Sequence, residues 1–181
     1  MIKSAYSFAT QKEKIKQHII VVWVDNETGV LARVVGLFSG RGYNIDSLAV
    51  AEVDKKKNIS RITIATSGTP QVLQQIKLQL GKLVPVHKVA DFPSNKKTLM
   101  REMALLKIVA SKTQLEKAKN LCKKYKYIIL DKTEKSFVFE ISALKKEIDD
   151  LIKKLQPLGL ASASRTGVVA MTKGSEIYQQ D

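Results

Sequence analysis

The chain has 181 residues, of which 44% are hydrophobic and 27% are charged, and its formal net charge is +14. This length fits one large domain or two small ones. We expect no membrane-spanning helix, because no apolar run approaches the roughly 18 residues that a span needs. The single cysteine, Cys122, excludes an intrachain disulfide and a zinc site built from several thiolates.

The positive charge is spread along the whole chain and comes mostly from lysine. Residues 1–17 carry a net +3, residues 18–92 carry +3 and residues 93–181 carry +8. Lysine and arginine neutralise phosphates, so a charge of this size raises the question of a nucleic-acid partner. The chain lacks the arginine clusters and interleaved aromatic residues of a dedicated nucleic-acid surface. We therefore expect no nucleic-acid partner.

Residues 18–92 have the pattern of one βαββαβ unit. The β-branched run HIIVVWV indicates a buried strand, and apolar residues at helical spacing from Val30 to Phe38 indicate a helix. The expected strands are 18–24, 45–53, 59–66 and 84–92, and the expected helices are 30–42 and a second one that begins at Pro70. This order is typical of the ferredoxin-like split βαβ fold, in which both helices cover one face of a four-stranded antiparallel sheet. The other face and the edges would be left for a partner.

The same order of elements recurs in the second half of the chain. The expected strands are 103–111, 126–131, 136–142 and 160–172, and the expected helices are 113–125 and 144–156. We therefore predict an α+β protein with two ferredoxin-like βαββαβ domains in tandem. The predicted boundaries are an N-terminal arm at 1–17, a first domain at 18–92, a linker at 93–100, a second domain at 101–173 and a tail at 174–181.

The stretch VDNETGVLARVVGLFSGRGYNID (24–46) raises the question whether the turn after the first strand holds a ligand. A helix that begins near Val30 presents unpaired N–H groups, which favour an anion such as a carboxylate. Gly29 lets a ligand approach the backbone closely, and the amides of Asn26 and Asn44 both donate and accept. In this fold the turn and Asn44 do not lie at the same end of the sheet by default. A dimer that pairs two sheets side by side would bring one subunit's turn against its neighbour's strand and form a receptor for a free amino acid.

Simpler explanations of the same residues stay open. Asn26 and Thr28 are residue types that cap helices, and Asn44 suits a tight turn after Gly42. Neither explanation needs a ligand. Residue types and spacing alone do not decide between capping and binding.

The stretch closely resembles the start of the regulatory (small) subunits of acetolactate synthase, also called acetohydroxyacid synthase. Further matching segments are SRITI (60–64), VLQQIKLQLGKLVPVHKV (72–89), REMALLKI (101–108) and SRTGVVAM (164–171). The resemblance extends from about residue 18 to residue 175. It implies that the first domain, 18–92, is an ACT domain.

The resemblance also implies a regulatory subunit without catalysis of its own. Such proteins bind a separate catalytic (large) subunit, raise its activity and make it sensitive to feedback by valine or another branched-chain amino acid. Thiamine diphosphate, Mg and FAD are expected on that catalytic subunit, and no cofactor or metal is expected on this chain. The effector would lie between the ACT domains of a homodimer, where the implied contacts are Asn26, Gly29 and Asn44, with Val30, Leu31 and Ile45 as companions.

Other function classes are less well supported by the residues. His18 and His87 lie in expected strands, Cys122 has no neighbouring histidine, and no phosphate loop or metal-ligand spacing is visible, so we do not expect an enzyme. A stand-alone ACT-type amino-acid-binding regulator is the main alternative. An RNA-binding ferredoxin-like module is less favoured, because the second and third strands carry no aromatic residue. The cysteine content agrees with a reducing compartment, either cytoplasm or plastid stroma.

Overall fold

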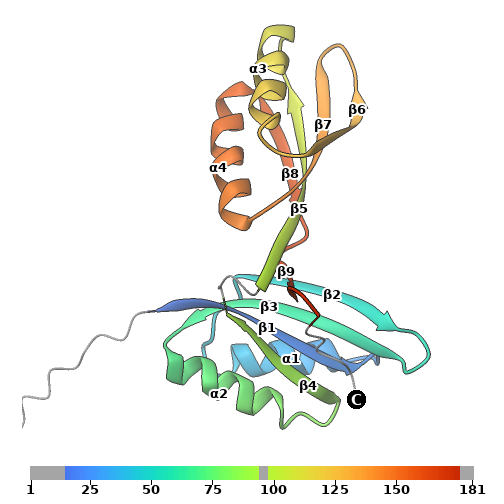
Figure 1. Ribbon diagram of the computed structural model, residues 1–181, viewed down its shortest axis with the longest axis vertical. Coiled ribbons are helices and arrows are strands. Elements are labelled where there is room, and N and C mark those ends of the chain that lie inside the picture. Colours follow the sequence, from blue (N-terminus) through green and yellow to red (C-terminus); the bar gives the residue numbers. More distant parts are fainter. Residues whose placement is uncertain (1–14, 94–97, 176–181) are drawn as a thin grey trace, which may run out of the picture.

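The computed structural model describes residues 15–93 and 98–175, which form two α+β domains joined by one long strand (Figure 1). The elements of the first domain are β1 (Lys16–Asp25), α1 (Val30–Ser39), β2 (Ser47–Asp54), β3 (Ile59–Gly68), α2 (Pro70–Leu80) and β4 (Val86–Pro93). The sheet has the strand order β2-β3-β1-β4 with every pair antiparallel. This is the predicted ferredoxin-like arrangement.

Local sequence explains where the helices of the first domain begin. Pro70 occupies the first turn of α2, and the Thr69 side chain accepts a hydrogen bond from the backbone N–H of Val72, as in an ordinary N-cap. The apolar stripe of α1, formed by Val30, Val34, Leu37 and Phe38, is buried against the sheet. Both helices thus cover one face of the sheet (Figure 1).

The C-terminal domain repeats this topology. Its elements are β5 (Thr98–Val109), α3 (Lys112–Cys122), β6 (Tyr127–Lys132), β7 (Ser136–Ala143), α4 (Lys145–Leu155), a 3₁₀ turn at Gln156–Leu158 and β8 (Leu160–Arg165). The strand order β6-β7-β5-β8 matches that of the first sheet, again with antiparallel pairs. The prediction of two ferredoxin-like units in tandem is therefore confirmed.

The end of the chain differs from the prediction. The single strand expected at 160–172 is two strands, β8 and β9 (Val169–Thr172), separated by a loop in which Gly167 has a φ of +79°. A glycine adopts this left-handed conformation without the steric penalty of a side chain, so the chain turns here. Strand β9 pairs with the first residues of β5, from Thr98 to Arg101. Residues 98–100, which were expected in a linker, are therefore part of β5.

The β5–β9 pair lies against the face of the first sheet that the helices leave open (Figure 1). Val168 and Ala170 are 6% and 3% exposed there and pack in a cluster with Trp23 and Phe92. The expectation that this whole face would be free for a partner is wrong, because the C-terminal segment of the same chain covers part of it. Within 15–93 and 98–175, no helix has the length and apolar character needed to cross a membrane.

Candidate functional site

The turn at 26–29 is held at the far end of β1 by contacts with β2 and β3. The hydroxyl of Ser60 donates a hydrogen bond to Asn26 Oδ1 at 3.0 Å, and Asn26 Nδ2 lies 3.5 Å from Glu52 Oε1. The backbone N–H of Asn26 donates to the carbonyl of Asn58 at 2.8 Å. The turn is exposed, and its asparagine is oriented by neighbouring strands.

The first turn of α1 has no side-chain cap. Gly29 occupies the N-cap position with a φ of +85°, and no side chain accepts a hydrogen bond from the helix there. The explanation that Asn26 and Thr28 merely cap the helix is therefore wrong. A Cβ added to Gly29 would meet no atom within 4 Å, so the space beside the positive end of the helix is open.

The two residues that follow Gly29 differ in what they can offer a ligand. The Val30 side chain is 4% exposed and packs in the core, which leaves only its backbone for a ligand. Leu31 is 40% exposed, so its side chain is accessible as well.

Asn44 and Ile45 precede β2 and are also held by side-chain contacts. Asn44 Nδ2 donates to Asp46 Oδ1 at 2.7 Å, and the hydroxyl of Thr66 donates to the Asn44 carbonyl at 2.6 Å. Ile45 is half-buried against the core between the sheet and the helices. Asn44 itself is exposed, and its amide is aligned by the carboxylate of Asp46.

The structure does not bring the two halves of the predicted site together within one chain. Asn26 contacts Ser60 and Asn44 contacts Thr66, so the two asparagines lie beside opposite ends of β3. Residues 60 and 66 are about 20 Å apart at roughly 3.3 Å per strand residue. A single copy of the chain therefore cannot place both asparagines on one small ligand.

Strand β2 runs between these two places at the edge of the sheet. Its only strand partner among the described residues is β3, which leaves its other edge unpaired. Val50 and Val53 on this strand are 44% and 50% exposed. An exposed edge of this kind is a natural surface for pairing with another strand.

The junction between the domains contains a charged cluster that the sequence reasoning missed. Glu102 is 4% exposed and accepts two hydrogen bonds from Arg165, at 2.7 and 2.8 Å. Arg165 also donates to Asp149 at 2.6 Å. Hydrogen bonds to Glu102 raise the pKa of the Arg165 guanidinium above its usual value. REMALLKI and SRTGVVAM contain the two partners, but their separation of 63 residues gave no sign that they meet.

Arg61 holds the C-terminal segment on the first sheet. Its guanidinium donates to the carbonyl of Ala170 and lies 5.5 Å from the ring centre of Trp23. Burial lowers the pKa of Arg61 from its usual value, and its Nε is buried without a hydrogen-bond partner in the described part of the chain. Arg61 thus tethers β9 to the sheet at the cost of partial desolvation.

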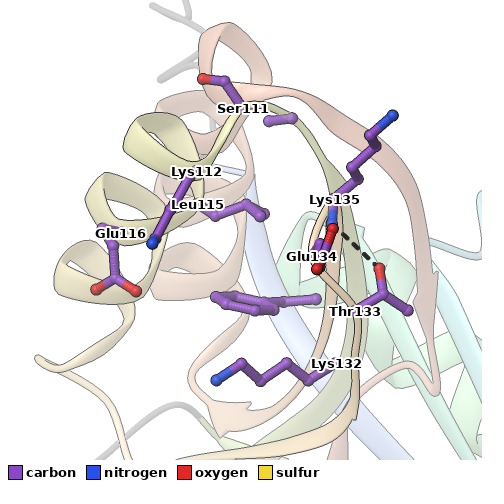
Figure 2. A pocket seen from close by; sticks show the side chains of 10 residues that line it. Ser111, Lys112, Leu115, Glu116, Lys132, Thr133, Glu134 and Lys135 are labelled. Carbon is purple, nitrogen blue, oxygen red and sulfur yellow. Dashed lines mark hydrogen bonds between the residues drawn. The ribbon is translucent and has the colours of Figure 1, made fainter.

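A groove of about 560 Å³ lies in the C-terminal domain between the start of α3 and the β6–β7 turn (Figure 2). Its lining includes the apolar side chains of Leu115 and Phe137 and the charged side chains of Lys112, Glu116, Lys132, Glu134 and Lys135. None of the predicted effector residues lines it. Charges of both signs are mixed along this lining, so the groove does not favour a ligand of one charge.

The residues weighed as catalytic groups have structural contacts. His18 Nδ1 lies 2.9 Å from Asp91, and His87 Nε2 lies 2.7 Å from Asp25. Cys122 is fully buried, and burial raises the pKa of its thiol to about 11, which makes a poor nucleophile. The residues that the structure describes contain no group of three or more His, Cys, Asp or Glu side chains suited to a metal ion.

Both domains match models of one protein family. Residues 20–88 match a family described as an acetohydroxyacid-synthase-small-subunit-like ACT domain, and residues 101–174 match a family described as the small subunit of acetolactate synthase. The two matches together extend over nearly the whole described chain, on both sides of the domain junction.

Named relatives and a solved structure agree with these matches. The chain is 33% identical to the acetolactate synthase small subunit of Aquifex aeolicus, over 94% of this chain and 88% of that protein. It is 36% identical to the acetolactate synthase isozyme 3 small subunit of Salmonella typhimurium, over 90% of this chain and 99% of that protein. The crystal structure of the Thermotoga maritima acetolactate synthase small subunit superposes with a TM-score of 0.81 and 30% identity, covering 89% of this chain and 99% of that one. The resemblance seen in the sequence is confirmed: this chain belongs to the family of acetolactate synthase small subunits, with an ACT domain as its first domain.

Proposed function

We propose that this chain is the regulatory subunit of acetolactate synthase in branched-chain amino acid biosynthesis. It binds the separate catalytic subunit, raises its activity and transmits feedback inhibition by valine or a related amino acid. The observation that carries this proposal is the family match on both domains, and the uncapped, exposed turn before α1 in the ACT domain supports it. Thiamine diphosphate, Mg and FAD belong to the catalytic subunit in this proposal, and the chain performs no catalysis alone.

The effector site is proposed to form between two copies of the chain. If the free edge of β2 pairs with the same edge of a second copy, the two strands run antiparallel about a twofold axis. Antiparallel pairing reverses the ends of β2, so the Asn26 end of one copy faces the Asn44 end of the other. The dimer thereby joins the two halves that one chain keeps about 20 Å apart.

Each half would supply a different part of an amino-acid receptor. The open first turn of α1, with Gly29 and the backbone N–H groups that follow, suits the ligand's carboxylate. Asn44 of the second copy, aligned by Asp46, suits the ammonium group. Leu31 and Ile45 offer aliphatic surface to a branched side chain, while Val30 contributes backbone only. One methylene is worth about 1–3 kcal/mol, so we expect modest discrimination among branched amino acids.

The alternatives are less well supported by the structure. A stand-alone ACT regulator does not account for the C-terminal domain, which matches the family model over 101–174. An RNA-binding module would need an exposed aromatic platform on the sheet, whereas Trp23 is 6% exposed under β9. Of the two compartments predicted, the cytoplasm agrees better with relatives from bacteria and an archaeon.

Calorimetric titration with valine tests the proposed site. We expect saturable binding to the wild-type chain and a loss of about 10- to 100-fold in affinity for Asn44→Ala, because a hydrogen bond to a charged group is worth about 1.5–3 kcal/mol. Asn120→Ala is the control, since Asn120 is an exposed asparagine on α3, in the other domain. Full affinity in Asn44→Ala would contradict the assignment.

Mixing two defective variants tests whether the site is shared between copies. Asn26→Ala and Asn44→Ala are each expected to bind valine weakly as pure dimers. In a mixed dimer, one site combines the two unaltered asparagines and the other combines both substitutions. Unfolding and refolding the mixture should therefore restore tight binding at one site of each mixed dimer. If mixing restores nothing, the two asparagines do not act on the same ligand across an interface.

A further inference from the structure

The loop at 166–168 of the C-terminal domain rests on the first residue of β2. The backbone N–H of Val168 donates to the hydroxyl of Ser47 at 3.3 Å. A Cβ added to Gly167 would lie 3.2 Å from the Ser47 Cβ and 3.4 Å from the carbonyl of Leu48. The loop and the strand are therefore in direct contact at a place where only glycine fits without displacing one of them.

The same loop is fixed to the C-terminal domain at its other end. Arg165 precedes it and binds the buried Glu102 with two hydrogen bonds and Asp149 with a third. The backbone N–H of Thr166 donates to the carbonyl of Met103 at 3.1 Å, and the N–H of Met103 lies 3.2 Å from the Thr166 hydroxyl. The loop is thus fixed to the C-terminal domain by hydrogen bonds and is not a free connection.

Ser47 is close to the proposed effector contact. It follows Asp46, whose carboxylate accepts hydrogen bonds from Asn44 Nδ2 at 2.7 Å and from the Ser67 hydroxyl at 2.9 Å. Beside this contact, a cavity of about 400 Å³ lies between the start of β2 and the C-terminal domain. Its lining includes Asp46, Glu102, Lys145, Arg165 and Thr166. The loop therefore touches the strand at Ser47 and leaves open space beside Asp46. A shift of the loop can change the position of residues 46–48 without breaking a packed core.

We propose that the loop at 166–168 is the positioning element of the effector site. By holding Ser47 it fixes the start of β2 and the carboxylate of Asp46, and through them the amide of Asn44. Effector binding and the seating of the C-terminal domain on the ACT sheet are then coupled, and the coupling acts equally in both directions. This inference rests on the proposed function for the identity of the effector, while the mechanical link between loop and strand does not.

The polar contact at Ser47 restrains the position of β2 more sharply than the apolar packing of β9 does. Val168 and Ala170 bury their side chains against Trp23 and its neighbours in the middle of the sheet. Burial is non-directional and tolerates small shifts. The Val168–Ser47 hydrogen bond and the close approach of Gly167 depend on distance and direction. Together with the backbone contacts of Asp46 and Ser47 to Ala65 of β3, they set the position of one end of β2.

Two glycine substitutions separate positioning from general backbone strain. Gly167 has a φ of +79° and Gly174 a φ of +76°, but a Cβ on Gly174 would meet no atom within 4 Å. Gly167→Ala therefore adds both strain and a clash with Ser47, whereas Gly174→Ala adds similar strain alone. We expect Gly167→Ala to weaken valine binding by about 10-fold and Gly174→Ala by less than about 2-fold, a difference of the size typical for allosteric coupling. Ser47→Ala, which removes only the hydroxyl, serves as a milder second variant if Gly167→Ala does not fold.

Hydrogen–deuterium exchange tests the link without reference to any effector. In Gly167→Ala and Ser47→Ala, the amides of residues 44–48 should exchange about 10-fold faster than in the wild type and in Gly174→Ala. Unchanged exchange at 44–48 in both variants would overturn the proposal. The two variants could show faster exchange while the wild type binds no branched-chain amino acid. This outcome would support the positioning role of the loop and contradict the proposed effector.

The reciprocal effect gives an independent readout on the wild-type chain. Saturation with valine should slow exchange of the amides at 166–168, which no predicted ligand contact reaches. A purely structural loop would show the same exchange with and without valine, and that result would overturn the coupling. An unrelated amino acid, used at the same concentration, controls for non-specific protection.

Discussion

The two domains have the same strand order but differ in how their sheets are covered. The ACT sheet has buried clusters on both faces, one beneath α1 and α2 and a second under β9. The C-terminal sheet has one buried cluster, on its helix side, and exposes Val109 and Ile128 on the other face, at 48% and 57%. Shared topology therefore does not give the two sheets the same surfaces. What differs is the C-terminal segment, which leaves its own domain and covers the sheet of the other.

Because of this difference, the two domains leave different surfaces exposed. The ACT domain has buried clusters on both sheet faces and leaves the β2 edge and the 26–29 turn exposed, where we propose that a second copy and a ligand bind. The C-terminal domain keeps an open sheet face and a lysine-rich exterior. The predictions below test whether the coverage seen in the structure holds in solution, from the largest expected effect to the smallest.

The largest effect is expected from Trp23→Ala. Trp23 is 6% exposed in the cluster under β9, and truncating a buried tryptophan costs about 3–5 kcal/mol of folding stability. Chemical denaturation followed by circular dichroism measures the change. A cost below about 1 kcal/mol would mean that β9 does not cover this face in solution, because substitutions of exposed residues change the folding stability by only that much or less.

Arg165→Met is expected to cost slightly less, about 3 kcal/mol, because it leaves the buried Glu102 without its partner. The double variant Glu102→Leu/Arg165→Met should recover much of that loss, since no charge is then buried alone. A double-mutant cycle on the unfolding free energies gives the interaction between the two residues. Additive losses would show that the bidentate pair contributes no coupling to the domain junction.

A smaller, pH-dependent effect is expected at Asp149. Burial opposes its charge, but hydrogen bonds from Arg165 and Lys145 outweigh burial and hold the pKa of Asp149 below its usual value. A lowered folded-state pKa stabilises the protein above about pH 4, and this contribution is lost as the pH falls through the folded-state pKa. Asp149→Asn should therefore lose less stability than the wild type between pH 6 and pH 3, in urea titrations at matched ionic strength. If the unfolding free energies of the two proteins fall by the same amount between pH 6 and pH 3, the assignment is contradicted.

The smallest effect is expected from Ile128→Ala. Ile128 is 57% exposed on the open face of the C-terminal sheet, and substitutions at such positions usually change stability by less than about 0.5 kcal/mol. It is also the matched control for Trp23→Ala, because both residues lie on the sheet face away from the helices. A loss comparable to that of Trp23→Ala would show that the second sheet is covered in solution as well.

Local patterns in the sequence determined the elements and the family. Helical spacing in 30–39, Thr69-Pro70 before α2 and the β-branched run in β1 each specify structure through neighbouring residues. Such signals act over one to four residues, so they can be recognised without a fold. The stretch 24–46 is long enough to identify the family by itself, and the comparisons agree with it.

Only the tertiary structure decided how distant segments meet. It placed Asn26 and Asn44 beside opposite ends of β3, paired Glu102 with Arg165 and split the last predicted strand at Gly167. Composition and spacing do not encode these facts, because they depend on contacts between segments tens of residues apart. Periodicity shows which side of a strand is apolar, but it cannot show whether a helix, another strand of the same chain or a second subunit covers that side.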